Sequence, residues 1–240
     1  MSRIHVGVIA CFAALLAGCA PLYLARTHTT STPRPQPPDM VDLAHEPVAT
    51  LGLLAPASLQ GFSPFLSHPL AVALADGAPQ IRARPAQETM NRLNEQGLAG
   101  AYAELVEGFA RSSILDRDRL RRIGSALGSR YVFLPGVAEL NHTLVDRFDA
   151  LGLKMVRNQI VTLRLWLQLW DTQSGRMLWE SAGEATVSSP VLTTSQTPGL
   201  DGIAQTLWLR MIRDDLVSAH PNRDRSSSSA TSDSPGRRLE

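Results

Sequence analysis

One segment of the chain alternates so regularly between apolar and polar residues that it constrains the fold more than any other. From Val161 to Trp170, every second residue is Val or Leu, and Thr, Arg, Trp, Gln and Trp stand between them. A period of two places these two sets on opposite faces of a β-strand. Turn residues follow at 171–175, so residues 176–187 are predicted to return as the partner strand of a hairpin.

The predicted hairpin brings three tryptophans to one face of the sheet. If Trp170 pairs with Met177 across the turn, Gln168 lies opposite Trp179. Exposed aromatic patches mark contact sites. We therefore predict that Trp166, Trp170 and Trp179 form a surface for a partner protein or for a second copy of the chain. The alternative is that the chain's own last helix, or the segment before the hairpin, covers this face.

Apolar runs and helical spacing define the other elements. Strands are predicted at 48–54, 80–84 and 131–140, and helices at 67–77, 86–110, 116–127 and 197–220. This order predicts an α/β domain, three-layer-like, with a mixed, largely antiparallel sheet of four to five strands and with helices mainly on one face.

Residue types that favour the start and the end of a helix occur at the boundaries of the helix predicted at 116–127. Asp116 can accept a hydrogen bond from the first turn of a helix, and Gly128 permits the left-handed conformation that ends one. Gly97 or Gly100 is predicted to break the long helical stretch 86–110.

The strand that begins at residue 131 and the segment after it leave two questions open. Pro135 lies inside the strand, which predicts either an edge strand or a bulge. Residues 141–158 mix charges with large apolar side chains without clean alternation. They are either a long loop or the extended arms of a hairpin.

The amino-terminal residues predict export and a lipid anchor. Arg3 is followed by an apolar run that is too short to span a bilayer, as in a secretory signal. The run ends in Leu16, Ala17, Gly18 and Cys19, which resemble the lipobox of bacterial lipoproteins. This resemblance implies that Cys19 is acylated, with palmitate among the acyl chains, and becomes the first mature residue. The alternative is an ordinary signal peptide with a chance cysteine.

Composition divides the chain into four segments. Residues 1–18 are the predicted signal peptide, and residues 19–46 are the lipidated cysteine with a proline-rich, flexible tether. Residues 47–220 are the predicted α/β periplasmic domain. The serine-rich and charged residues 221–240 are predicted to be disordered.

The charge balance and the cysteine count exclude several functions. The chain has 23 Lys and Arg against 22 Asp and Glu, and loss of Arg3 with the signal leaves it formally neutral. A neutral domain offers no basic face for nucleic acid. Of the 2 cysteines, Cys11 leaves with the signal and Cys19 is used by the anchor. No thiol then remains for a disulfide, a metal or a nucleophile.

Two segments of the sequence resemble patterns of a known protein family. Residues 123–136 read Ile-Gly-Ser-Ala-Leu-Gly-Ser-Arg-Tyr-Val-Phe-Leu-Pro-Gly, and residues 169–179 read Leu-Trp-Asp-Thr-Gln-Ser-Gly-Arg-Met-Leu-Trp. They are similar to the patterns Leu-Gly-Ala-Asp-Tyr-Val-Leu-x-Gly and Asp-Thr-x-Thr-Gly-x-x-x-Trp. These patterns are typical of bacterial outer-membrane lipoproteins related to the curli secretion component, of the penicillin-binding-protein activators and of the amino-terminal domain of TolB. Ser129 and Arg130 stand here where the family has Ala-Asp.

No group of residues reaches the pattern of a catalytic, metal or cofactor site. Glu104 and Glu107 stand three apart on a predicted helix, and we interpret them as its solvent-exposed side rather than as paired carboxylates. Residues 61–65 hold only half of a nucleophile elbow. The histidines of the mature chain are scattered without the spacing of metal ligands, at His28, His45, His68, His142 and His220.

These observations predict a non-enzymatic, lipid-anchored accessory or scaffold protein. The absence of Asp after Cys19 favours the outer membrane in lipoproteins that resemble this one, and the domain is expected to face the periplasm. The resemblance implies an envelope assembly for secretion, surface-structure biogenesis or cell-wall synthesis. The expected partners are the membrane, through acyl chains, and envelope proteins or other copies of the chain, without a cofactor. The alternative is a periplasmic enzyme or small-ligand-binding lipoprotein whose pocket the sequence does not reveal.

Overall fold

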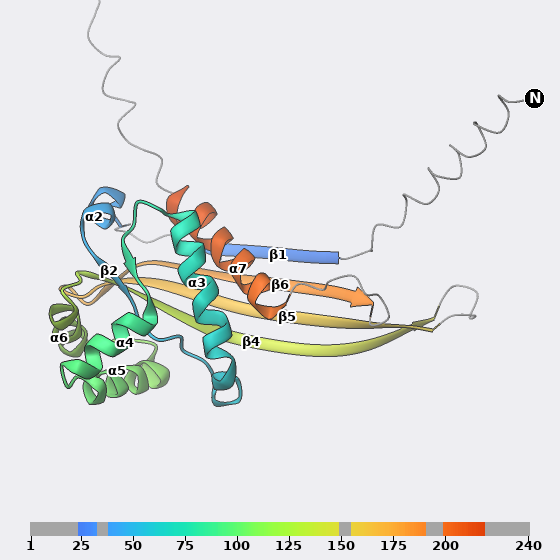
Figure 1. The fold of residues 1–240 in the computed structure, drawn as a ribbon, viewed down its shortest axis with the longest axis horizontal. Helices are drawn as coiled ribbons and strands as arrows, with labels where there is room; N and C mark the ends of the chain where they lie inside the picture. Colours follow the sequence, from blue (N-terminus) through green and yellow to red (C-terminus); the bar gives the residue numbers. More distant parts are fainter. Residues whose placement is uncertain (1–23, 33–37, 149–154, 191–198, 219–240) are drawn as a thin grey trace, which may run out of the picture.

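A single mixed sheet of six strands is the centre of the fold (Figure 1). The computed structural model describes residues 24–32, 38–148, 155–190 and 199–218. The strands are β1 (Leu24–Ser31), β2 (Val48–Thr50), β3 (Ala83–Arg84), β4 (Tyr131–Phe148), β5 (Met155–Asp171) and β6 (Arg176–Pro190). Their order is β1-β6-β5-β4-β2-β3. The first four in this order are antiparallel neighbours, and β2 is parallel to both β4 and β3.

The mixed, largely antiparallel character of the sheet is confirmed, but the prediction of four to five strands is wrong. The additional strand is β1, which comes from the range predicted as a tether. Its sequence has no apolar alternation, and it becomes a strand because it pairs along its whole length with β6. A short helix, α2 (Met40–His45), also lies within the predicted tether range. The folded part therefore begins before residue 47, whereas residues 1–23, 33–37 and 219–240 lie outside the described residues.

Helices cover both faces of the sheet, so the prediction of helices mainly on one face is wrong. α3 (Ser63–Gly77) and α7 (Leu200–Arg210) share one core with the sheet, and α4 (Ala86–Glu95), α5 (Ala99–Ser112) and α6 (Arg117–Leu127) share the other. A 3-10 turn, η1 (Ala57–Phe62), precedes α3, and a π-helical turn, η2 (Met211–Val217), continues α7. None of the described helices combines the length and the apolar character that crossing a membrane requires.

Both faces need this cover because both carry large apolar side chains. On β5, Leu163, Leu165, Leu167 and Leu169 are almost fully buried against α3 and α7. Burial of one such side chain contributes about 2 kcal/mol. On the opposite face, Val132 and Leu134 of β4 are buried against α4, α5 and α6. The result is a three-layer arrangement of helices, sheet and helices.

The predicted ends of α6 and the predicted break in the helical stretch 86–110 are confirmed, whereas α3 begins at Ser63 and not at 67, and α7 begins at Leu200 and not at 197. The Asp116 carboxylate accepts a hydrogen bond of 2.9 Å from the backbone N–H of Arg119 and caps α6. Gly128 ends this helix with a φ of 60°, in the left-handed region that favours glycine. Gly97, with a φ of 66°, separates α4 from α5.

Removal of the cap gives the first testable prediction. Asp116→Ala should lower the free energy of unfolding by about 1 kcal/mol, because it leaves backbone N–H groups of the first turn without an acceptor. Urea denaturation of the mature chain measures this loss. Asp118→Ala is the control, since Asp118 is an exposed acidic residue in the same turn without the capping bond. Equal losses in the two variants would show that only the acidic charge matters.

The two open questions about β4 are answered by its pairing with β5. The register shifts between Val137 and Glu139, so a bulge follows Pro135. Beyond the bulge, Asn141–Phe148 pairs with residues 155–162, which are therefore hairpin arms and not a loop. Residues 149–154 lie outside the described residues. The hairpin projects well beyond the helices (Figure 1).

Candidate functional site

The three tryptophans do not share one face of the sheet. The predicted pairing of Trp170 with Met177 is confirmed, but Leu169, and not Gln168, lies opposite Trp179. Leu178 is an extra residue in β6 at this point, and such a bulge moves every later side chain of the strand to the other face. Trp179 consequently lies in the core beneath α3 and α7.

Trp166 and Trp170 lie on the opposite face, where the chain itself covers them. The half-buried ring of Trp166 is 5.8 Å from the ring of Phe109 of α5, between centroids. Trp170 is 4% exposed, and its indole N–H donates to the side-chain oxygen of Gln168 at 3.0 Å. Gln168 in turn donates to the Glu180 carboxylate at 2.7 Å.

Trp179 is covered by the last helical segment, as the alternative prediction proposes. It is 3% exposed, and its indole N–H donates to the backbone oxygen of Asp215 in η2 at 3.2 Å. The Asp215 carboxylate also accepts a hydrogen bond from the Ser181 hydroxyl. The predicted partner surface is thus divided between two cores, and no exposed aromatic patch joins its three members.

Arg130, which replaces the Asp of the family pattern, joins segments that are far apart in the sequence. Its guanidinium lies 3.6 Å from the Asp42 carboxylate of α2 and 3.7 Å from the Asp171 carboxylate at the hairpin turn. Asp171 also accepts a hydrogen bond of 2.8 Å from the backbone N–H of Gln173. Burial raises the pKa of Tyr131 to about 12, so its hydroxyl stays protonated and donates to Asp42 at 3.4 Å. This cluster holds α2 against the turn.

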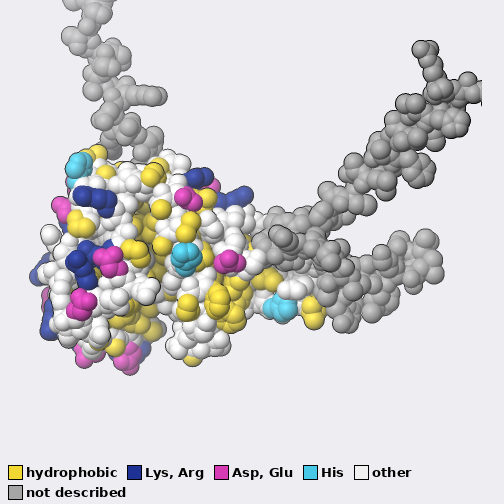
Figure 2. All heavy atoms as spheres, in the orientation of Figure 1, with side chains coloured by type: hydrophobic (Ala, Val, Ile, Leu, Met, Phe, Trp, Pro, Cys, Tyr) yellow, Lys and Arg dark blue, Asp and Glu magenta, His cyan; other side chains and the backbone are white. Residues whose placement is uncertain are grey.

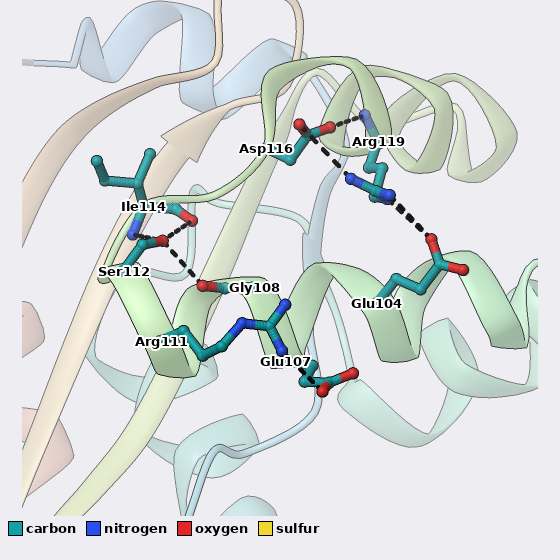
Figure 3. Close-up of a pocket in the computed structure, with 8 residues that line it drawn as sticks. All are labelled: Glu104, Glu107, Gly108, Arg111, Ser112, Ile114, Asp116 and Arg119. Atoms are coloured by element: carbon teal, nitrogen blue, oxygen red, sulfur yellow. Dashed lines mark hydrogen bonds and ion pairs between the residues drawn. The ribbon is translucent and has the colours of Figure 1, made fainter.

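A groove of about 410 Å³ lies between α5 and α6 (Figure 3). Its walls are Glu104, Glu107, Gly108, Arg111, Ser112, Ile114, Asp116 and Arg119. Arg119 joins the two helices, with its guanidinium 3.0 Å from the Glu104 carboxylate, and Arg111 lies 2.7 Å from Glu107. Both carboxylates are exposed, which confirms their interpretation as the outer side of α5. Each is paired with an arginine, so they do not act as a carboxylate pair.

A second hollow, of about 640 Å³, lies beside the edge strand β1. Its lining residues are Arg26, Thr27, His28, Glu184, Thr186 and Arg210. Arg210 reaches it from α7, with its guanidinium 3.5 Å from the Thr27 carbonyl oxygen. The Glu184 carboxylate is held by Arg164 at 2.7 Å, and Arg164 also lies 2.7 Å from Glu139. The hydrogen bond to Glu184 and the charges of both carboxylates raise the pKa of Arg164.

The other residues considered in the sequence are dispersed. Across residues 24–32, 38–148, 155–190 and 199–218, no three or more His, Cys, Asp or Glu side chains gather as metal ligands would. His28, His45, His68 and His142 lie on β1, α2, α3 and β4, respectively. Leu16, Ala17, Gly18, Cys19 and His220 lie outside the described residues.

Comparison of the amino-acid sequence does not assign this chain to a protein family. No model of a protein family matches it, and no curated protein sequence does. Sequence reasoning also missed the hollow beside β1, because its walls come from segments far apart in the chain. Arg210 and Thr27, for example, are 183 residues apart.

Solved structures do match. The chain is similar to a PelC dodecamer from Paraburkholderia phytofirmans, with a TM-score of 0.42, 14% identity, and coverage of 79% of this chain and 96% of that one. It is similar to lipoprotein GNA1162 from Neisseria meningitidis, with a TM-score of 0.41, 16% identity, and coverage of 67% and 93%. The LpoB C-terminal domain from Salmonella enterica matches with a TM-score of 0.34, 15% identity, and coverage of 58% and 81%.

Proposed function

We propose that this protein is a non-enzymatic, lipid-anchored accessory or scaffold protein that faces the periplasm from the outer membrane. It acts through contacts with envelope proteins or with further copies of itself, in secretion, surface-structure biogenesis or cell-wall synthesis. Acylated Cys19 supplies the anchor, and the folded domain supplies the contacts. The observation that carries the proposal is the free edge of β4 in the projecting hairpin.

The free edge begins where β4 loses its second neighbour. β4 pairs with β2 only over Tyr131–Phe133, and a single bridge joins Gly136 to Leu54. The backbone N–H of Val137 still donates to the Leu54 oxygen, and from residue 138 to Phe148, β5 is the only strand paired with β4 among the described residues. Such an edge presents a row of main-chain N–H and C=O groups. An extended segment of another protein can pair with these groups and lengthen the sheet.

The side chains along this edge also suit a specific contact. Asn141, His142 and Thr143 are exposed, and Leu144 is 55% exposed. On the face drawn in Figure 2, hydrophobic and histidine side chains lie on the projecting part of the sheet. Leu144 offers an apolar anchor, whereas its polar neighbours and the bulge at the start of the edge discourage indiscriminate pairing.

Photo-crosslinking in cells tests this edge. A photoreactive amino acid replaces Leu144 in the full lipidated chain, and we expect irradiation to give an adduct of defined mass. An adduct with the mass of two chains identifies self-association, and any other protein adduct identifies an envelope partner.

The control places the same photoreactive residue at position 114. Ile114 is 66% exposed, but it lies in the connection between α5 and α6 and is not part of the β4–β5 hairpin. We expect this position to give no adduct or a different one. The edge is not the contact surface if position 144 gives no adduct, or if both positions give the same one.

A further inference from the structure

The direction of β1 places the hollow beside it close to the predicted lipid anchor. Leu24, at the start of β1, pairs with Ser188, and Ser31, at its end, pairs with Ser181. The chain therefore enters β1 at the end of the sheet toward which the hairpin projects (Figure 1). Cys19 precedes Leu24 by five residues. An extended chain spans at most about 3.6 Å per residue, so Cys19 lies within about 18 Å of Leu24.

This short connection changes the expected position of the domain. If Cys19 carries the acyl chains, as the proposed function assumes, the lipid headgroups lie close to the first residues of β1. The hollow begins at Arg26, two residues after Leu24. A flexible tether of 28 residues, as predicted, would have allowed the domain to lie far from the membrane. Because residues 24–31 of that range form strand β1 of the sheet, Cys19 precedes the fold by only five residues.

The walls of the hollow match the chemistry of a phosphate group. Arg26 and His28 alternate on β1, opposite Thr186 and Glu184, and Arg210 adds a second guanidinium from α7. Among the described residues, no carboxylate lies within ion-pair distance of Arg26 or Arg210, whereas Glu184 is already held by Arg164. Arginine binds phosphate oxygens through paired N–H donors.

We propose that the hollow lined by Arg26, His28 and Arg210 binds the phosphate of a phospholipid headgroup in the leaflet that holds the anchor. The edge strand β1 then lies against the membrane surface, and the β4–β5 hairpin keeps a fixed direction relative to it. The lipid chains hold the protein at the membrane, and the phosphate contact orients it.

Vesicle flotation of the unlipidated chain, carrying Cys19→Ser, tests the proposal without help from the acyl chains. One set of vesicles holds equal amounts of phosphatidylethanolamine and phosphatidylglycerol, and the other holds digalactosyldiacylglycerol, which has no phosphate. We expect binding to the phospholipid vesicles alone. Arg26→Ser combined with Arg210→Ser should weaken this binding about 25-fold, since each basic residue near such a surface contributes about fivefold.

The matched control is Arg111→Ser combined with Arg119→Ser, which removes the same charge from the α5–α6 groove and should leave flotation within about twofold of the parent. Three results would each overturn the proposal: no flotation of the parent, equal binding to both vesicle types, or equal losses in the two double variants. Crosslinking at position 144 is independent of this readout. Loss of flotation alone removes the headgroup site, and loss of the crosslink alone removes the proposed function.

Discussion

Gly136→Ala is expected to destabilise the domain by about 3 kcal/mol, because β4 has no room for a side chain at this position. A Cβ atom at residue 136 would overlap two ring carbons of Trp166, far inside van der Waals contact. The indole cannot simply withdraw, because the ring of Phe109 packs beside it. The strand and α5 would have to separate, which disturbs the core shared by the sheet and the three helices α4, α5 and α6.

Urea denaturation, followed by circular dichroism, measures the loss. Gly108→Ala is the control, because no atom lies within 4 Å of a Cβ placed there and the position is inside α5. Alanine should stabilise that helix by about 0.5–1 kcal/mol, so the two identical substitutions have opposite signs. In a Trp166→Ala background, the cost of Gly136→Ala should largely disappear. A Gly136→Ala variant as stable as the parent would show that β4 can shift to accommodate the added methyl group at little cost.

Cys19→Ser is expected to move the protein from the membrane fraction to the soluble periplasmic fraction. Serine lacks the thiol that we propose is acylated, and each buried methylene of an acyl chain contributes about 0.8 kcal/mol to membrane binding. The loss of several acyl chains therefore removes nearly all of the hold. The phosphate contact that we propose at Arg26 and Arg210 is weaker than binding through acyl chains. A salt wash should therefore release any Cys19→Ser protein that this contact keeps at the membrane.

Fractionation followed by mass spectrometry of the amino-terminal peptide checks this result. Cys11→Ser is the matched control, since Cys11 lies inside the predicted signal and the variant should remain acylated and membrane-bound. Crosslinking at position 144 should also fall in Cys19→Ser, because confinement to a surface raises the effective concentration of weakly binding partners. Cys19→Ser protein that stays in the membrane fraction through a salt wash would refute the anchor.

The features predicted correctly from the sequence are those with a local physical cause. The β5–β6 hairpin follows from strict alternation, and α6 begins and ends at Asp116 and Gly128 because a cap and a left-handed turn need those residue types. The break at Gly97 has the same origin. Each of these signals is complete within a few residues, so the rest of the fold is not needed to interpret it.

The features that were missed depend on distant partners or on a single inserted residue. β1 is polar throughout, and only its pairing with β6 makes it a strand. The bulge at Leu178 turns Trp179 to the other face, and no residue type there indicates it. The basic residues Arg26, His28 and Arg210 line the hollow beside β1 only because β1, β6 and α7 are neighbours in the fold. A pattern of spacing within one segment does not contain that information.

The pairing of β1 with β6 also determines how mechanical load would pass from the predicted lipid anchor to the domain. The chain enters β1 at Leu24 and runs toward the body of the fold. Tension applied to Leu24 along the strand, away from that body, slides β1 lengthwise against its neighbour. All eight residues of β1 then resist together in shear, instead of peeling away one at a time. A domain attached in this way can bear tension between the membrane and a partner bound at its β4–β5 hairpin.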